Sequence, residues 1–334
     1  MKNYYIRKIK GKQSNHKGKQ SNHKGKQSNH KGKQSNHKGK TKNNINHIYS
    51  DKNGKRVSKK TIEPYLKMYI APAYDNVKIN MNINAKVLAI GYDERDRPQY
   101  IYNSKCIKSR GKNKFKKLIK FGKEHKKIMK RIENDYKSKT DSKNKQIAMI
   151  LKIIIDCNFR IGNDKYTKEN NSFGVSTLQS KHIKTNDGIT IDFIGKKGVQ
   201  NTCKIDNLKM KNNLKTKKKR YKNSEKIFQY MKDGQSYTVN GEDVNIYLGE
   251  YTTKNFRTWS ANTLLISHLL ENKYTIKDGI EYVAKKLHHT PSICKSNYID
   301  PKLVEFYENN PDKFCEYFKG DVNRRFTDFL MKHY

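Results

Sequence analysis

The sequence predicts an α+β protein with a small β-rich N-terminal domain and a larger, mainly α-helical domain, preceded by a disordered tail. Three observations lead to this prediction. A polar repeat occupies the start of the chain, short alternating segments follow it, and long apolar segments with helical spacing fill the remainder. We place the tail at 1–44, the β-rich domain at 45–110 and the helical domain at 111–334.

The N-terminal tail is a low-complexity repeat. Residues 10–37 hold four copies of Lys-Gly-Lys-Gln-Ser-Asn-His, and a fifth begins at 38–40. The period is seven, but no position is apolar, so a coiled coil is excluded and disorder is expected. The repeated histidines are metal ligands in principle. A DNA-binding arm or a recent repeat expansion fits this cationic tract better.

The charge of the chain indicates a polyanionic partner. The sequence has 73 Lys and Arg against 31 Asp and Glu, a formal net charge of +42. Residues 1–50 contribute 14 of these positive charges and no acid, which leaves +28 on the rest. An excess of this size favours nucleic acid as the partner, with binding that weakens as salt rises.

Other classes of protein are disfavoured. No run of about 18 apolar residues is present, which argues against a membrane span, and the first residues lack the apolar core of a signal peptide. The five cysteines are dispersed, form no Cys-x-x-Cys pair and are odd in number, so we expect reduced thiols in an intracellular protein. These cysteines are Cys106, Cys157, Cys203, Cys294 and Cys315.

Three segments of the β-rich domain read as strands: 77–83, 86–92 and 99–102. In the last of these, Tyr100 and Tyr102 share one face and Gln99 lies on the other. Two tyrosines on a basic strand suit stacking or phosphate contact, but half-buried strand tyrosines explain them equally well. Residues 109–114 are expected to be a linker.

The helical domain begins with a long basic helix at 115–136. The next helix ends near residue 156, and residues 140–142 supply its N-cap. Its isoleucines and leucine recur at helical spacing, which predicts burial. Arg160 follows this helix directly and should lie at the edge of the core, although a solvated arginine is the plain alternative.

A β-hairpin follows, with strands at 189–194 and 199–205 and lysines at its tip. A basic connection is expected at 208–222. Further on, Thr290 is a good N-cap and Pro291 suits the first helical position. His289 then lies just before a helix start, and Tyr298 about two turns into that short helix, with residues 300–301 ending it.

Five segments occur in an order that resembles the small type IB DNA topoisomerases of poxviruses, other large DNA viruses and some bacteria. The resemblance covers about 60–334 and implies the fold shared by tyrosine recombinases and type IB topoisomerases. Each segment alone is a modest signal, but all five in order are a strong one. They are 99–102, 159–178, the Gly195-Lys196-Lys197 turn, the Lys254-Asn255-Phe256-Arg257-Thr258 box and 289–298.

The resemblance implies transesterification without ATP or a metal ion. Tyr298, one of 22 tyrosines, would attack a DNA phosphate and form a 3′-phosphotyrosyl bond. Arg160, Arg257 and His289 would contact the non-bridging oxygens, where charge accumulates in the transition state. Lys196 would protonate the 5′-oxygen leaving group.

The remaining expectations also come from the resemblance. Lys197 competes with Lys196 for the general-acid role. The partner is double-stranded DNA, the protein is expected to be a monomer, and a viral source would place it in the virion or at the host-cell site of viral DNA synthesis or transcription. The expected DNA contacts are Gln99, Tyr100, Tyr102, Lys165, Tyr166, Lys254 and Asn262.

Two other functions remain open from sequence. Tyrosine recombinases share this catalytic domain but typically have His-x-x-Arg at the second arginine box, where this chain has Lys254 three residues before Arg257. A non-enzymatic DNA-packaging protein would explain the charge and the repeats. It would leave the ordered set of catalytic residue types unexplained.

Overall fold

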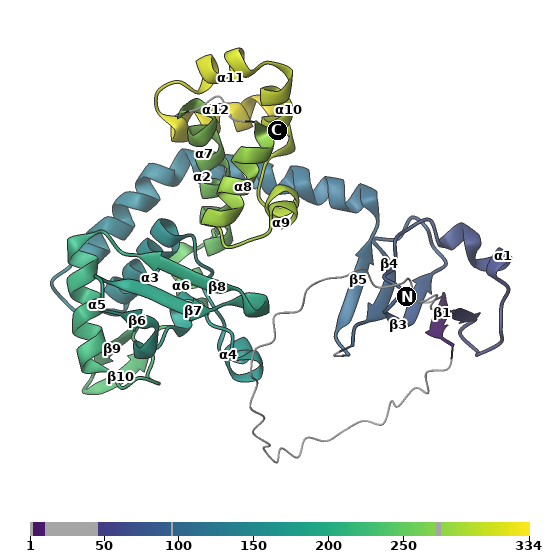
Figure 1. Ribbon diagram of the computed structural model, residues 1–334, viewed down its shortest axis with the longest axis horizontal. Coiled ribbons are helices and arrows are strands. Elements are labelled where there is room, and N and C mark those ends of the chain that lie inside the picture. Colours follow the sequence, from purple (N-terminus) through teal and green to yellow (C-terminus); the bar gives the residue numbers. More distant parts are fainter. Residues whose placement is uncertain (1–2, 11–45, 95, 272–274) are drawn as a thin grey trace. The chain divides into compact units, whose positions relative to one another are not determined.

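A computed structural model describes residues 3–10, 46–94, 96–271 and 275–334. The chain divides into two compact units, Met1–Gly111 and Lys112–Tyr334 (Figure 1). The first is built around a β-sheet and the second is mainly helical, so the predicted α+β class is confirmed. The Lys-Gly-Lys-Gln-Ser-Asn-His repeats, except Lys10, lie outside the described residues.

The first unit contains a five-stranded sheet in the order β2-β1-β3-β4-β5, with every neighbouring pair antiparallel. The three predicted strands are present as β3, β4 and β5. A short helix, α1 (Lys59–Ile62), and a 3-10 turn, η1 (Glu63–Tyr65), follow β2. The strands are β1 (Tyr4–Ile9), β2 (His47–Ser50), β3 (Asp75–Asn80), β4 (Val87–Tyr92) and β5 (Pro98–Tyr102).

Strand β1 corrects the predicted tail. Residues 1–44 were expected to be disordered, but Tyr4–Ile9 pairs with both β2 and β3. Tyr5 and Arg7 are buried. An arginine at a buried strand position hides the apolar–polar alternation of the strand, and here loop carbonyls accept from its terminal nitrogens. Arg7 Nη2 donates to Ala71 O at 2.8 Å and to Tyr74 O at 3.0 Å.

The expected linker at 109–114 is also wrong, because it lies inside helix α2 (Ser104–Lys137). This segment contains no proline and is rich in lysine and arginine, which are good helix formers. Its one glycine, Gly111, has open space where a Cβ would stand, so only a modest propensity cost opposes the helix. The long basic helix predicted at 115–136 therefore begins about three turns earlier.

The second unit consists of helices around a three-stranded antiparallel sheet, β6-β7-β8, and a separate two-stranded sheet of β9 and β10 (Figure 1). Its elements after α2 are α3 (Lys143–Cys157), α4 (Asp164–Asn170), η2 (Val175–Thr177), η3 (Ser180–His182), β6 (Ile183–Lys184), β7 (Thr190–Ile194), η4 (Lys196–Gly198), β8 (Gln200–Lys204), α5 (Leu208–Arg220), β9 (Gln229–Lys232), β10 (Gln235–Thr238), α6 (Gly241–Leu248), α7 (Thr253–Glu271), α8 (Ile276–Lys286), α9 (Pro291–Asn297), α10 (Pro301–Asn309), α11 (Pro311–Phe318) and α12 (Val322–His333).

Helix α3 is the centre of this core. Ser142 is its N-cap, with Oγ accepting from Lys145 N, which confirms the predicted cap. Nine of its residues are buried, as the helical spacing of its isoleucines predicted. The helix packs against α6, α7 and β9. The predicted basic connection at 208–222 instead forms helix α5, with Met210 and Leu214 buried on its inner face.

The expectation of five reduced cysteines is wrong for two of them. Cys157, the last residue of α3, forms a disulfide with Cys203 of β8. The two lie 46 residues apart in sequence, but the packing of α3 beside the hairpin brings their Cα atoms to 5.8 Å. Cys106, Cys294 and Cys315 are free thiols. None of the described helices is both long and apolar enough to cross a membrane.

Candidate active site

Arg160 is carried by the loop between α3 and α4. Asn158 ends α3 in the left-handed region, with φ of 53°, and this turn buries Phe159 and directs the chain away from the helix axis. The loop is fixed from outside, since Arg160 O accepts from Val175 N at 2.9 Å. A Cβ on Gly174 would stand 2.4 Å from Gly162 N, so this close backbone approach requires glycine.

Arg257 lies in the second turn of α7 and is only 4% exposed. Its Nη2 donates to Leu287 O at 3.0 Å, which joins α7 to the end of α8. Burial lowers the pKa of Arg257, and the Tyr298 phenol opposes this effect. The side chain nevertheless stays charged, because an arginine pKa remains far above neutrality.

His289 joins the two arginines. Its Nε2 lies 3.0 Å from Arg160 Nη2 and 3.0 Å from Arg257 Nη2. Guanidinium groups only donate, so Nε2 must be unprotonated to accept from them. Burial is the largest cause that lowers the pKa of His289, followed by the charges of Arg160 and Arg257, and the value falls to about 3. The imidazole is therefore neutral near pH 7.

Tyr298 follows helix α9 and lies beside this group. Thr290 caps α9 and Pro291 is its first residue, which confirms the predicted helix start. The helix ends at Asn297, so Tyr298 is its C-cap rather than an internal residue, and residues 300–301 begin α10. The Tyr298 ring centroid lies 5.0 Å from that of His289 and 5.5 Å from Arg257 Cζ.

The backbone around Tyr298 is held by a buried amide. Asn262 on α7 is fully buried; its Nδ2 donates to Tyr298 O at 2.9 Å and its Oδ1 accepts from Asp300 N at 2.8 Å. Lys114 Nζ adds a bond to Asn297 O at 3.1 Å. The expectation that Asn262 contacts DNA is corrected, because a side chain with no exposed surface presents nothing to a duplex.

The hairpin lysines lie in the turn between β7 and β8. Lys196 is exposed, yet its positive charge contributes to lowering the pKa of His289. Lys197 adopts the left-handed conformation, with φ of 65°. Asn201 underlies the turn, donating to Val199 O at 2.7 Å. A Cβ on Gly195 would stand 2.4 Å from Asn201 Nδ2, so any larger residue there would have to displace the Asn201 amide beneath Lys196.

The cluster of Arg160, Arg257, His289 and Tyr298 carries uncompensated positive charge. Among the described residues, neither arginine forms an ion pair with a carboxylate. In the same part of the chain, Arg257 Nε and Nη1 are buried without a hydrogen-bond partner. Buried charge without a partner is costly, and an anion that paired with both guanidiniums would offset that cost.

The other expected DNA contacts lie outside this cluster. In the second unit, Lys254 is exposed on the first turn of α7, and Lys165 and Tyr166 are exposed on α4. In the first unit, Tyr100 and Tyr102 stack at 6.2 Å, as their shared strand face predicted. Tyr100 is 51% exposed, so this pair is a surface feature of the sheet.

Two supporting residues were missed from sequence. His288 adopts φ of 55°, in the region that favours glycine, and its Nε2 lies 3.2 Å from Cys157 O. Asp300 is fully buried, and Tyr334 donates to its Oδ1 at 2.8 Å. The doubled histidine at 288–289 was visible in the sequence, but its partners Cys157 and Arg160 lie 131 and 129 residues away.

Comparison with known proteins identifies the family. The model for the catalytic core of eukaryotic DNA topoisomerase I matches residues 103–315. A DNA topoisomerase 1B from Acanthamoeba polyphaga mimivirus is 34% identical over 313 residues, covering 85% of this chain and 90% of the relative. A DNA topoisomerase 1B from vaccinia virus is 26% identical over 264 residues, covering 74% of this chain and 80% of the relative.

A more distant relative comes from a cellular organism. A DNA topoisomerase 1 from Mycosarcoma maydis is 27% identical over 201 residues, which is 54% of this chain and 20% of that protein. The family match includes Arg160, Lys196, Arg257, His289 and Tyr298, and the mimivirus relative covers most of both chains. This chain belongs to the type IB DNA topoisomerase family.

Proposed function

We propose that this protein relaxes supercoiled double-stranded DNA by reversible cleavage of one strand through Tyr298. The observation that carries the proposal is the cluster itself. Two arginines and a histidine from three separate segments converge on one tyrosine, and no carboxylate among the described residues pairs with either arginine. A phosphodiester supplies the missing negative charge and presents two non-bridging oxygens to planar guanidinium donors.

In this mechanism the phosphate replaces His289 as the acceptor for the arginines. Arg160 Nη2 and Arg257 Nη2 both donate to His289 Nε2 in the free protein, so both donors already point to one place. Preorganised donors stabilise charge that develops on the non-bridging oxygens without further reorganisation. His289, neutral before binding with its proton on Nδ1, must take a proton on Nε2 before it donates to a phosphate at that place.

The covalent step exchanges one phosphodiester for another. Tyr298 Oη forms a bond to phosphorus as the bond to the 5′-oxygen breaks, and the tyrosyl proton is lost to the surroundings. Lys196 donates a proton to the leaving 5′-oxygen and recovers it when the strand is rejoined. The phosphotyrosyl bond retains the energy of the phosphodiester, so the proposal requires neither a nucleotide nor a metal ion.

Lys196 is our choice for the proton donor because its charge acts on His289, the centre of the cluster. The left-handed conformation of Lys197 makes that residue part of the turn geometry. Tyr100 and Tyr102 on the sheet, and Lys165, Tyr166 and Lys254 in the second unit, are proposed DNA contacts. Gln99 is a weaker candidate, because its Nε2 donates to Asp93 Oδ2 at 3.0 Å.

Family membership favours this activity over the recombinase and packaging functions that the sequence left open. Single-strand relaxation needs one cluster, so we propose that a monomer suffices. The mimivirus and vaccinia virus relatives cover 85% and 74% of this chain. We therefore propose a viral protein that acts in the virion or where viral DNA is copied or transcribed in the host cell.

The test is relaxation of supercoiled plasmid in EDTA without ATP. The unaltered protein should relax the plasmid and form a covalent protein–DNA adduct when denatured during the reaction. Tyr298→Phe should lose both activities, while a matched Tyr100→Phe variant should retain the adduct. An adduct that persists in Tyr298→Phe would contradict the assignment of the nucleophile.

A further inference from the structure

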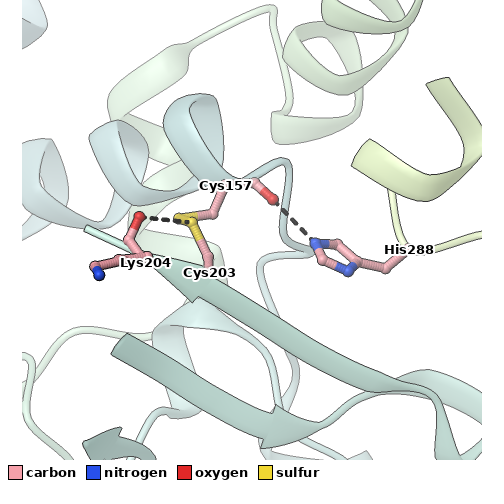
Figure 2. Close-up of a disulfide and its surroundings, with 4 residues drawn as sticks. All are labelled: Cys157, Cys203, Lys204 and His288. Atoms are coloured by element: carbon pink, nitrogen blue, oxygen red, sulfur yellow. Dashed lines mark hydrogen bonds between the residues drawn. A yellow bond between two sulfur atoms is a disulfide. The ribbon is translucent and has the colours of Figure 1, made fainter. Parts of the chain in front are cut away.

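The disulfide between Cys157 and Cys203 joins the segment that leads to Arg160 to the hairpin that carries Lys196, the proposed proton donor for the leaving group (Figure 2). Cys157 precedes Arg160 by three residues and ends α3. Cys203 lies on β8 and pairs with Ile191 of β7, at the base of the hairpin whose turn holds Lys196. This one covalent bond therefore fixes the base of the lysine hairpin to the helix that leads into the Arg160 loop.

Non-covalent contacts supplement that bond without replacing it. The Phe159 and Phe193 rings meet at 4.9 Å, which joins the Arg160 loop to β7. Figure 2 shows His288 directed at the Cys157 carbonyl, where Nε2 lies 3.2 Å from the oxygen. Cys157 is thus also in contact with His288, the residue directly before His289.

The two cysteines differ in burial. Cys157 is buried, at 4% exposure, whereas Cys203 is a partly buried residue packed against the core. Cys203 Sγ also lies 3.7 Å from Lys204 O. A disulfide sulfur carries no hydrogen, so this contact becomes a hydrogen bond only after reduction, when the thiol donates. Cys203 is the more exposed of the two residues, so we take its sulfur as the point of attack, and after reduction its thiol can donate to Lys204 O.

We propose that the Cys157–Cys203 disulfide positions the lysine hairpin against Arg160, and that a dithiol reductant switches off efficient protonation of the leaving group by opening it. This inference rests on the proposed function. A dithiol thiolate attacks Cys203 Sγ, the S–S bond breaks, and Cys157 leaves and takes up a proton. The second thiol of the reductant then releases Cys203 as a thiol and closes into a cyclic disulfide, so two electrons and two protons pass to the protein.

The geometry sets the size of the effect. Three residues separate Ile191 from the end of β7, about 10 Å of strand. A rotation of about 6° at the base would therefore move the turn by about 1 Å, and a misplacement of this size costs up to about 100-fold in rate. Because the Phe159–Phe193 contact remains, we expect reduction to slow cleavage by about 10-fold or more rather than abolish it.

The experiment compares two leaving groups in single-turnover cleavage. One duplex carries the natural 5′-oxygen at the scissile phosphate, and the matched duplex carries sulfur there. Thiols are stronger acids than alcohols, so a 5′-thiolate leaves without a proton donor. Dithiothreitol should slow cleavage of the oxygen duplex by about 10-fold or more and leave the sulfur duplex nearly unchanged, with mass spectrometry reporting the state of the disulfide.

Variants separate this role from general stability. Cys203→Ser should cleave the oxygen duplex at the reduced rate whether or not dithiothreitol is present. Cys315→Ser, a matched change of a free cysteine on α11, should respond to dithiothreitol as the unaltered protein does. Equal rates with the disulfide closed and open, failure of the disulfide to form under oxidising conditions, or equal slowing of both duplexes would each overturn the proposal. Adduct formation by Tyr298→Phe would instead overturn the proposed function.

Discussion

Replacing Asn262 by alanine tests whether the nucleophile depends on a buried amide. The substitution removes the bond from Asn262 Nδ2 to Tyr298 O and the bond from Asp300 N to Asn262 Oδ1. Both lost partners are buried backbone groups, one the carbonyl of the nucleophile itself and the other the amide two residues after it. Leaving each unsatisfied costs about 1–3 kcal/mol, or about 2–6 kcal/mol for the pair.

This cost should appear in both stability and rate. If about 2 kcal/mol of this cost is lost from the free energy of unfolding, the melting temperature falls by about 4–8 °C for a unit of this size. If a further 1.4–2.8 kcal/mol reflects displacement of Tyr298 from the phosphate, cleavage slows by about 10- to 100-fold. Thr263→Ala is the matched control, because its hydroxyl bonds only Trp259 O and Ser260 O on the same helix.

The assays are single-turnover cleavage and DNA binding. Binding is measured in the Tyr298→Phe background, where no covalent adduct forms. Because Asn262 is fully buried, the double variant should bind DNA as tightly as Tyr298→Phe alone. A normal cleavage rate in folded Asn262→Ala would refute the positioning role. A 10-fold loss of DNA binding with little loss of cleavage rate would instead support the direct DNA contact that the resemblance implied for Asn262.

Three further predictions follow from the same structure. The pKa of His289 is lowered to about 3 from an ordinary 6.5, so the unfolded state takes up this proton first as pH falls, and the free energy of unfolding should decline from about pH 6.5 towards 3. Between pH 7 and 5, His289→Gln should therefore lose less of its urea midpoint than the unaltered protein does. An equal loss in the two proteins would contradict this. Gly195→Ala should slow cleavage by displacing Asn201 beneath the Lys196 turn, whereas Gly111→Ala, with open space around its Cβ, should cleave normally. Deleting residues 12–42 removes ten lysines but keeps β1 and β2, whose adjoining ends are already linked by the bond from Lys10 N to Asn46 O at 2.8 Å, so folding should persist while DNA binding weakens. Deleting residues 1–40 also removes β1 and should therefore lower the melting temperature. Equal melting temperatures for the two deletions would count against the role of β1.

Sequence patterns were most informative where local chemistry fixes local structure. The spacing of isoleucines in α3, the cap at Ser142 and the Thr290–Pro291 start of α9 each depend on residues within two turns of one another. The ordered motifs around Arg160, Arg257 and Tyr298 identified the family for a similar reason. Each motif is a short segment that can be recognised from its own residue types, without knowing which residues contact it in the fold.

The prediction failed where a residue's role depends on a distant partner. An arginine in β1 looked like part of a cationic tail, because the carbonyls that satisfy Arg7 come from residues 71 and 74. Lys196 and Lys197 are adjacent and chemically alike, and the choice between them still rests on electrostatics and turn geometry. Asn262 was expected to contact DNA because two of its partners, Tyr298 O and Asp300 N, lie on a distant segment that helix periodicity does not reveal.

The sequence by itself determined the excess of positive charge, the α+β class, the central buried helix and the residue types of a phosphate-directed site. Only the tertiary structure decided that β1 belongs to the sheet, that Asn262 is buried behind Tyr298, and that Cys157 meets Cys203 across 46 residues. The physical reason is common to all three. Periodicity shows which face of an element is buried, as in α3, but hydrogen bonds and disulfides between distant segments depend on which elements pack together, and periodicity does not show that.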